Sequence, residues 1–284
     1  MPNPLKAAIK SGIRMNDRVG DLFAKIGSSS HPRGDVYLDY RNTRLALEAA
    51  LGKESPLPAV RDVLRNLRRQ LQSDVGNVMN DAVLLGQDES LRQMRFYQVR
   101  PRGSVRLTEQ TYTAVEAVMA KYTAQEAAIT ALVLSGADPL EIIGDDTRSG
   151  ILSVGDIAGA AAYWGTFLVW NAFDSQVEEV QQTEQVRFMK QAVAALDART
   201  TDCCLRVHGQ IRELDEPFHL TGTPRYADYQ DWPGFHWYCR TSGVLYQEEF
   251  DEGLTDKMRD GAQFFMRERE KGNTPDNYPV DAFR

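Results

Sequence analysis

Apolar residues recur at helical spacing through much of the chain, and this pattern predicts several long amphipathic helices. The clearest stripe begins after the proline-containing break at residues 55–58, and its mean spacing is close to the 3.6-residue repeat of an α-helix. Its members are Val60, Val63, Leu67, Leu71, Val75, Val78, Ala82 and Leu85. A helix with such a stripe must pack against other elements, so the pattern predicts a mainly α protein.

Capping signals predict further helices along the chain. A helix over 108–134 is closed by Gly136, because glycine readily adopts the left-handed conformation that ends helices. The residues at 138–141 combine an N-cap aspartate, a first-turn proline and a glutamate, and they predict a short helix. The same logic at 153–156 begins a longer helix that runs to about residue 183, and residues 255–271 return to a helical pattern.

The texture of the sequence changes after residue 197. Prolines, glycines and aromatic residues become frequent, and the apolar run at 244–246 suits a short strand. We therefore expect a helical scaffold with a small irregular α+β module, rich in Cys and His, near the C-terminus. Residues 26–37 read as a loop or linker, and residues 272–284 read as an extended tail.

These patterns suggest three regions. Residues 1–107 form a basic helical N-terminal region, 108–254 combine helices with the Cys/His module, and 255–284 form a C-terminal helix and tail. The net charge is −7, yet residues 1–107 hold 18 Lys and Arg against 11 Asp and Glu. The basic region could therefore face nucleic acid or an acidic protein surface, or it could be an ordinary solvated set of helix faces. Its densest basic group is Arg61, Arg65, Arg68 and Arg69.

No apolar run reaches the roughly 18 residues that a membrane span needs, and the N-terminus lacks the pattern of a secretory signal. We expect a protein that is made in cytoplasm and does not cross a membrane.

Three cysteines are too few for a disulfide scaffold, and they cluster in one short region with two histidines. Cys204 and His208 form a Cys-x3-His pair, and His236 and Cys239 form a His-x2-Cys pair. Soft ligands gathered in a loop-rich module are typical of a structural zinc site, with Cys203 as a substitute ligand.

Two other readings of the cluster stay open: a disulfide between Cys204 and Cys239, and buried free thiols without a metal. Catalysis is less well supported, because the chain has no HExxH helix, no zinc-deaminase signature and no phosphate-binding glycine loop. We expect a protein that is not an enzyme.

The cluster lies inside a longer motif that resembles the Mu F-like family of phage head-morphogenesis proteins. That family has a D-x-R-T segment, one or two cysteines, a G-K/Q-hydrophobic step and, after a gap, a P-x-x-H-x-x-C-R ending. The matching positions are Asp197, Arg199, Thr200, Cys204, Gly209, Gln210, Ile211, Pro233, His236, Cys239 and Arg240. The chain departs from the family at Thr201, where many members have a second cysteine, and at Trp237, where proline is frequent.

The resemblance implies a minor capsid protein of a tailed phage. Members of the family associate with the portal or the inner face of the capsid, and they assist head assembly and DNA packaging or ejection. This implies a virion location, assembly in the host cytoplasm, and portal protein, other capsid proteins and phage DNA as partners. The alternatives are an enzyme carried in the virion and a metal-stapled nucleic-acid-binding protein.

Overall fold

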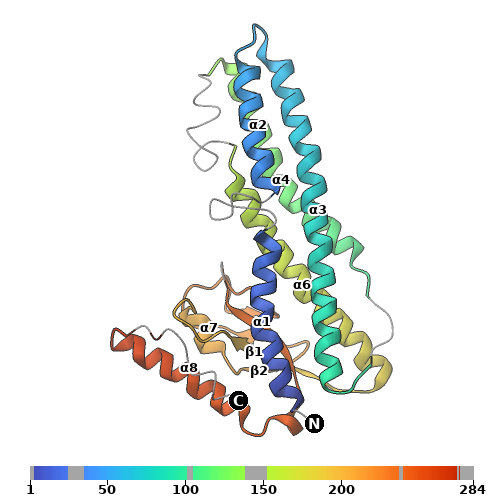
Figure 1. Ribbon diagram of the computed structural model, residues 1–284, viewed down its shortest axis with the longest axis vertical. Helices are drawn as coiled ribbons and strands as arrows, with labels where there is room; N and C mark the ends of the chain where they lie inside the picture. The colour runs from blue at the N-terminus through green and yellow to red at the C-terminus, as the bar shows by residue number, and fades with distance from the viewer. Residues whose placement is uncertain are drawn as a thin grey trace. The chain divides into compact units, whose positions relative to one another are not determined.

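Helices make up most of the computed structural model, which describes residues 3–24, 35–100, 105–137, 152–236, 239–273 and 275. The helices are α1 (Pro4–Ala24), α2 (Asp35–Leu51), α3 (Pro56–Phe96), α4 (Thr108–Ser135), α6 (Val154–Glu184), α7 (Asp202–Val207) and α8 (Leu254–Glu270) (Figure 1). The prediction of a mainly α protein is confirmed. Among the described residues, no helix is long and apolar enough to cross a membrane.

Some sequence predictions fall outside the described residues or shift at their edges. The short helix predicted at 138–141 and nearly all of the tail lie outside the described residues, as does most of the predicted loop at 26–37. The last three residues of that loop were wrongly assigned, because α2 already begins at Asp35. The long helix α3 begins at Pro56, inside the predicted break, since proline fits the first turn of a helix.

The chain divides into two units, each assembled from separate stretches of sequence. The sheet unit contains residues 1–19, 84–106 and 169–284, and the helical unit contains residues 20–83 and 107–168. The sheet unit therefore includes parts of the N-terminal stretch that the sequence suggested was a separate region.

The predicted apolar stripe forms the buried face of α3 within the helical unit. Val60, Leu67, Leu71 and Val75 are completely buried, as the helical repeat requires. The neighbouring helix α4 ends where the sequence predicts, because Gly136 has a φ of +74° and its N–H bonds back to the last turn. Local sequence signals thus determine both helices.

Hydrogen bonds between buried polar side chains join the helices of this unit. The Tyr40 hydroxyl on α2 donates to Gln125 Oε1 on α4 at 2.9 Å, and the Gln125 amide donates to the Ser153 carbonyl at 2.8 Å. The Tyr122 hydroxyl on α4 donates to the Leu64 carbonyl on α3 at 2.6 Å. Because these partners are buried, each bond also fixes how the helices pack.

The sheet unit is built on three antiparallel strands in the order β2-β1-β5. These are β1 (Met189–Ala194), β2 (Ile211–Glu213) and β5 (Thr241–Tyr246), and β5 confirms the strand predicted at 244–246. A second, two-stranded sheet pairs β3 (Phe218–His219) with β4 (Tyr229–Gln230). The central strand β1 was not predicted from the sequence.

Two polar residues of β1 are buried, and each finds a partner far away in the sequence. Lys190 Nζ donates to the Leu214 carbonyl at 2.7 Å and lies 4.9 Å from the centre of the Trp232 ring. The Gln191 amide donates to Thr255 Oγ1 on α8 at 2.7 Å. These contacts satisfy Lys190 Nζ and the Gln191 amide nitrogen, which would otherwise make a buried central strand costly, while Gln191 Oε1 is buried without a hydrogen-bond partner among the described residues.

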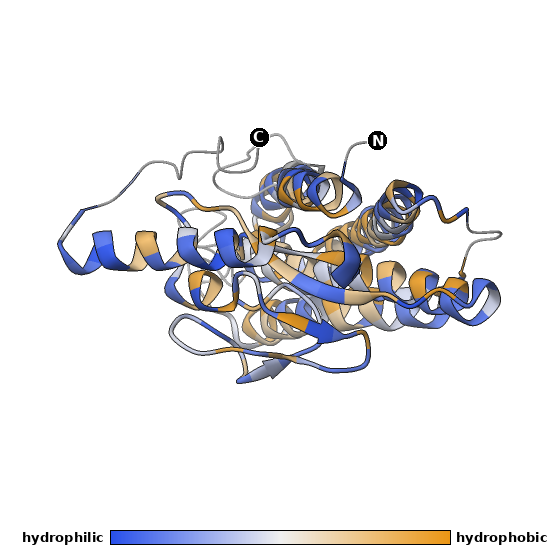
Figure 2. Cartoon of the chain, turned by 90° about the horizontal axis from the view of Figure 1, so that it is seen from below, coloured by the Kyte–Doolittle hydropathy of each residue, from blue (hydrophilic) through white to orange (hydrophobic). Residues whose placement is uncertain are grey.

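Helices from both ends of the chain cover this sheet. At Gly12 of α1, an added Cβ would lie 2.4 Å from a methyl group of Val244 on β5, so glycine allows the close approach. Near the C-terminal end of the chain, α8 packs against α7 (Figure 1). Figure 2 shows α8 as mainly hydrophilic with separate apolar bands, and its buried residues include Met258, Ala262 and Phe265. The sheet and its covering helices position the loops that carry the site.

Candidate metal centre

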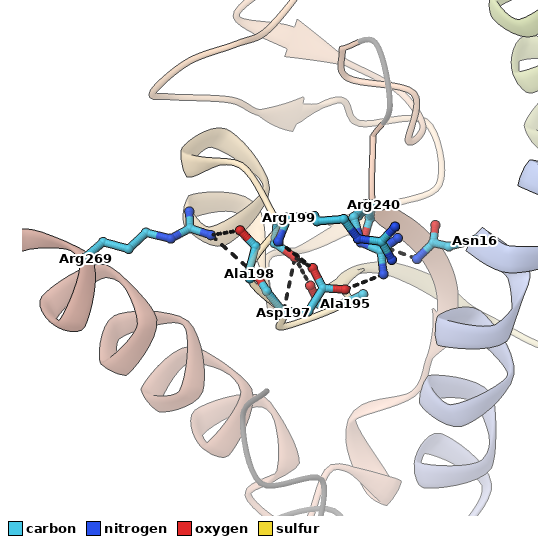
Figure 3. A network of polar contacts seen from close by, with 8 residues as sticks. Asn16, Ala195, Asp197, Ala198, Arg199, Arg240 and Arg269 are labelled. Atoms are coloured by element: carbon cyan, nitrogen blue, oxygen red, sulfur yellow. Dashed lines mark hydrogen bonds and ion pairs between the residues drawn. The ribbon is translucent and has the colours of Figure 1, made fainter. Parts of the chain in front are cut away.

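The loop between β1 and α7 is held by the two carboxylate oxygens of Asp197, which have different partners (Figure 3). Oδ1 accepts hydrogen bonds from the Arg199 N–H at 2.9 Å and from the Thr200 hydroxyl at 3.2 Å. Oδ2 forms an ion pair with the guanidinium of Arg240, which directly precedes β5. One side chain therefore shapes the loop and ties it to a segment 43 residues away.

The backbone at Arg240 extends this network toward α1. Its carbonyl accepts hydrogen bonds from the Ala195 N–H at 2.9 Å and from the Asn16 amide at 3.1 Å (Figure 3). Asn16 in turn accepts a hydrogen bond from the Ser242 hydroxyl at 2.9 Å. The D-x-R-T segment and the C-R ending of the motif thus meet in one polar network.

Two arginines of α8 bind backbone carbonyls of the same module. Arg269 donates to the Ala198 carbonyl at 3.2 Å, and Arg259 donates to the Gly209 carbonyl at 3.2 Å. Gly209 has a φ of +77°, which a residue with a side chain rarely adopts, and an added Cβ would lie 3.1 Å from Arg259. This explains why the motif needs glycine at this turn.

The sulfur of Cys204 lies at the centre of the Cys/His cluster. It is 3.1 Å from Nε2 of His236 and 3.8 Å from the sulfur of Cys239. The Thr201 hydroxyl, at the start of α7, lies 2.8 Å from the same ring nitrogen. Helix α7 supplies one side of the cluster, and the loop that precedes β5 supplies the other.

Cys203 joins the cluster from the adjacent position on α7. Its thiol donates to the Pro224 carbonyl at 2.7 Å. The ligand atoms of Cys203, Cys204 and His236 all lie within 4.8 Å of one another, and the three residues are buried. This group could hold a metal ion.

Hydrogen bonding gives the three thiols different acidities. The pKa of Cys204 is lowered, because the neighbouring polar groups of Cys203, Cys239 and His236 favour its thiolate. The pKa of Cys203 is raised by the adjacent Cys204 sulfur and by burial. Burial raises the pKa of Cys239. Cys204 is therefore the sulfur that becomes a thiolate first, and thiolates are the form that binds metals.

His208 does not join this group. Its Nδ1 accepts a hydrogen bond from the buried Ala194 N–H at 2.8 Å, so the proton of the neutral ring sits on Nε2. Nε2 is buried without a hydrogen-bond partner, and it has no lone pair to offer a metal in this state. Burial lowers the pKa of His208 to about 3, which keeps the ring neutral. The structure thus brings together Cys204, His236 and Cys239 of the predicted set, adds Cys203, and leaves His208 aside.

The chain matches no protein-family model, no curated protein and no solved structure. The donor atoms of the cluster indicate which metal it could hold. Thiolates and an imidazole are the ligands that zinc prefers, and two sulfurs each about 2.3 Å from a tetrahedral zinc lie about 3.8 Å apart. The separation of Cys204 and Cys239 is 3.8 Å. This one separation matches two tetrahedral sulfur ligands, and the group of Cys203, Cys204 and His236 could hold a metal ion.

Two other motif residues differ in their exposure. Arg199 is exposed and contributes its backbone N–H to the loop, whereas Pro233 is buried and lies three residues before His236 in the sequence. Trp237, the second departure from the family, lies outside the described residues. Sequence reasoning missed Asn16 and the arginines of α8, since nothing in their local sequence links them to the motif.

The basic group on α3 belongs to the helical unit, and several of its charges already have partners. Arg68 forms an ion pair with Glu126 on α4 and lies over the Tyr122 ring. Arg65 pairs with Asp62 at 3.0 Å. Arg69 donates to the Asn66 side chain, and Arg61 is exposed. These contacts reduce the charge that the group offers to an anionic partner.

Proposed function

We propose that this protein is a minor capsid protein that assists head morphogenesis in a tailed phage. One observation carries the proposal: motif residues that are far apart in sequence, Asp197 and Arg240, are joined in one network beside the Cys/His cluster. If the resemblance to the motif arose by chance, its residues would have no reason to lie in contact. The contact between Asp197 and Arg240 therefore supports treating the motif as one folded element.

We propose that the metal at this element is zinc, bound by Cys204, Cys239 and His236 with Cys203 as the fourth ligand. The site would link α7 to the loop before β5, and both segments also contribute a buried residue, Val207 and Phe235, to one apolar cluster. A structural zinc contributes on the order of 10 kcal/mol to folding in small modules, which far exceeds a single hydrogen bond. Its role here would be to hold the module in shape.

The proposed role is structural and not catalytic. Cys204 and His236 lie at a distance that suits a nucleophile and its base, which is the feature that favours the enzyme alternative. Both side chains are buried, however, with Cys204 0% and His236 4% exposed. A substrate could reach neither group without opening the module, so the geometry favours a structural metal site that links two segments.

The proposed partners are portal protein and other capsid proteins, with phage DNA as a further partner of the basic N-terminal residues. DNA binding of this kind depends on phosphate neutralisation and weakens steeply with salt. Retention of the full-length protein on duplex DNA at low ionic strength, lost as salt rises, would support this part. Because Arg65 and Arg68 are already paired, a lack of retention even at low salt would remove DNA from the proposal and leave the protein partners.

Location tests the function directly. The protein should be present in purified particles of the phage that encodes it, at few copies per particle, and should label at the portal vertex or the inner capsid. Heads assembled without it should be fewer or defective. A protein found free in the cytoplasm and absent from purified particles would refute the proposal.

Metal analysis tests the zinc site independently. Protein purified under reducing conditions should contain one zinc per chain, and Cys204→Ser should lose it. His208→Asn is the matched control, because it changes a buried histidine of the predicted set that the structure places outside the cluster. Zinc bound equally by the wild type and Cys204→Ser, or lost in His208→Asn alone, would exclude this ligand set.

A further inference from the structure

Two of the three thiols of the cluster are positioned to react with each other. The sulfurs of Cys204 and Cys239 lie 3.8 Å apart and come from segments separated by 35 residues. Both cysteines are free in this structure. A disulfide bond is about 2.05 Å long, so closure requires an approach of less than about 2 Å.

The third thiol is held out of this reaction. Cys203 donates its hydrogen to the Pro224 carbonyl at 2.7 Å, which directs its sulfur toward that loop. It also neighbours Cys204 on α7, and adjacent side chains of a helix do not face each other. A bond between these two neighbours would require the helix to unwind. The geometry therefore selects one pair among the three thiols.

We propose that the cluster is a redox switch, in which the metal-binding thiols of Cys204 and Cys239 are converted to a disulfide by a hydroperoxide. One of the two sulfurs attacks a peroxide oxygen and the O–O bond breaks, so that a sulfenic acid forms together with one molecule of water when the oxidant is hydrogen peroxide.

The second step closes the bond. The other sulfur of the pair attacks the sulfur of the sulfenic acid, the S–O bond breaks, and the hydroxide leaves as water with the proton that the attacking thiol gives up. Two thiols are oxidised, and one hydroperoxide is reduced. The product lacks two of the metal ligands, and Cys203 and His236 alone do not complete a tetrahedral site. A metal bound by these thiols would lose two of its ligands and would be released.

Both states link the same two segments, α7 and the loop before β5. This inference rests on the proposed function for its setting: a phage protein is assembled in a reducing cytoplasm and later leaves the cell, where disulfides persist. The switch would exchange a metal staple, which assembles reversibly, for a covalent one in the released particle.

The experiment uses the reduced full-length protein loaded with zinc and treated with hydrogen peroxide. Thiols are counted after denaturation, released zinc is followed with a chelating dye, and the joined peptides are mapped by mass spectrometry. We expect two of the three thiols to be lost together with release of the bound zinc. The joined peptides should contain Cys204 and Cys239.

Two matched variants make the result decisive. Cys203→Ser should still form the disulfide and lose both remaining thiols, whereas Cys239→Ser should form none. Persistence of all three wild-type thiols, over-oxidation without a cross-link, or a cross-link through Cys203 would each overturn the proposal. If Cys239→Ser does not fold when reduced, peptide mapping of the wild type and Cys203→Ser decides the question.

The setting is tested separately from the chemistry. Protein extracted from released particles with thiols blocked should carry the disulfide, and protein from the cytoplasm before lysis should not. A disulfide formed by the pure protein but absent from particles would overturn the switch as a feature of the released particle. Absence of the protein from particles would instead refute the proposed function.

Discussion

The divided roles of the Asp197 oxygens lead to a sharp prediction about the stability of the sheet unit. Asp197→Asn keeps an oxygen that can accept from Arg199 and Thr200, but it places an amide where Oδ2 meets Arg240. The side chains of Asp197 and Arg240 are only 18% and 20% exposed, so solvent screens the pair weakly. A hydrogen bond to a charged group contributes about 1.5–3 kcal/mol, and we expect Asp197→Asn to cost about 2 kcal/mol.

Asp197→Ala should cost more, because it also removes the acceptor for the Arg199 N–H, whereas the Thr200 hydroxyl keeps the Ala195 carbonyl as an acceptor. At about 1 kcal/mol for that lost hydrogen bond, the total is about 3 kcal/mol. Asp202→Asn is the matched control, since Asp202 pairs with Arg206 on the same module but the two side chains are 40% and 48% exposed. Exposed pairs of this kind contribute about 0.3–0.5 kcal/mol.

Urea unfolding of the full-length protein, followed by tryptophan fluorescence, measures these differences. With a denaturant slope of about 2 kcal/mol per molar urea, Asp197→Asn should lower the midpoint by about 1 M. The control should shift it by a few tenths at most. A cycle with Arg240→Ala should show coupling between the two positions. Equal midpoints for the wild type and Asp197→Asn, or an equal loss in Asp202→Asn, would refute the assignment.

Four further substitutions test the packing and the buried ionisable groups, each by its urea midpoint. Gly243→Ala should cost about 1–3 kcal/mol, because the added Cβ would lie 2.4 Å from the Trp232 ring, whereas Gly76→Ala on α3 meets nothing within 4 Å and should stabilise by about 0.5–1 kcal/mol. Burial raises the pKa of Asp174 to about 6, so its folded form holds the proton more tightly and stability falls as pH rises through this value. Asp174→Asn should therefore be more stable than the wild type at pH 7 by about 2 kcal/mol, and this gain should shrink toward pH 4; a gain that grew on acidification would contradict the sign. Burial lowers the pKa of His208 to about 3 from an ordinary value of 6.5, so the stability present above pH 6.5 is lost as pH falls toward 3. His208→Asn can keep an acceptor for the backbone N–H and should flatten that loss, and an unchanged pH profile would rule out His208 as its source.

The long helices could be predicted because their signals are local. The stripe from Val60 to Leu85 records which face of α3 is buried, and Gly136 supplies the one conformation that ends α4. Both signals lie within a few turns of the element that they define. The start of α3 was displaced because Pro56 can serve equally as a break and as a first helical residue.

The central strand β1 could not be predicted in the same way. Its sequence includes Lys190 and Gln191, which ordinarily mark a solvated face, yet both are buried. Their partners are the carbonyl of Leu214 and the hydroxyl of Thr255, which lie 24 and 64 residues away. Only the folded chain shows that Lys190 and the amide nitrogen of Gln191 find these partners.

The candidate site was predicted in outline, with one difference in its ligands. Cys204 and His208 are four residues apart, which would place them on the same face of a continuous helix. Helix α7 ends at Val207, however, and the backbone at His208 has left the helical region with ψ at 126°. The histidine ring therefore turns to Ala194, and Cys203 takes part in the cluster through its contact with Cys204.

The interleaved arrangement of the units also affects the order in which the chain can fold during synthesis. Every residue of the helical unit has been made by residue 168, whereas the sheet unit gains its last strand at 241–246 and then α8. The hydrogen bond between Asn16 and Ser242 cannot form until 226 further residues have been synthesised after Asn16. Contacts of such separation form slowly, because a long stretch of chain must close before they contribute. Cys203 and Cys204 therefore leave the ribosome before Cys239 and α8 exist, and their thiols lack their folded surroundings during that interval.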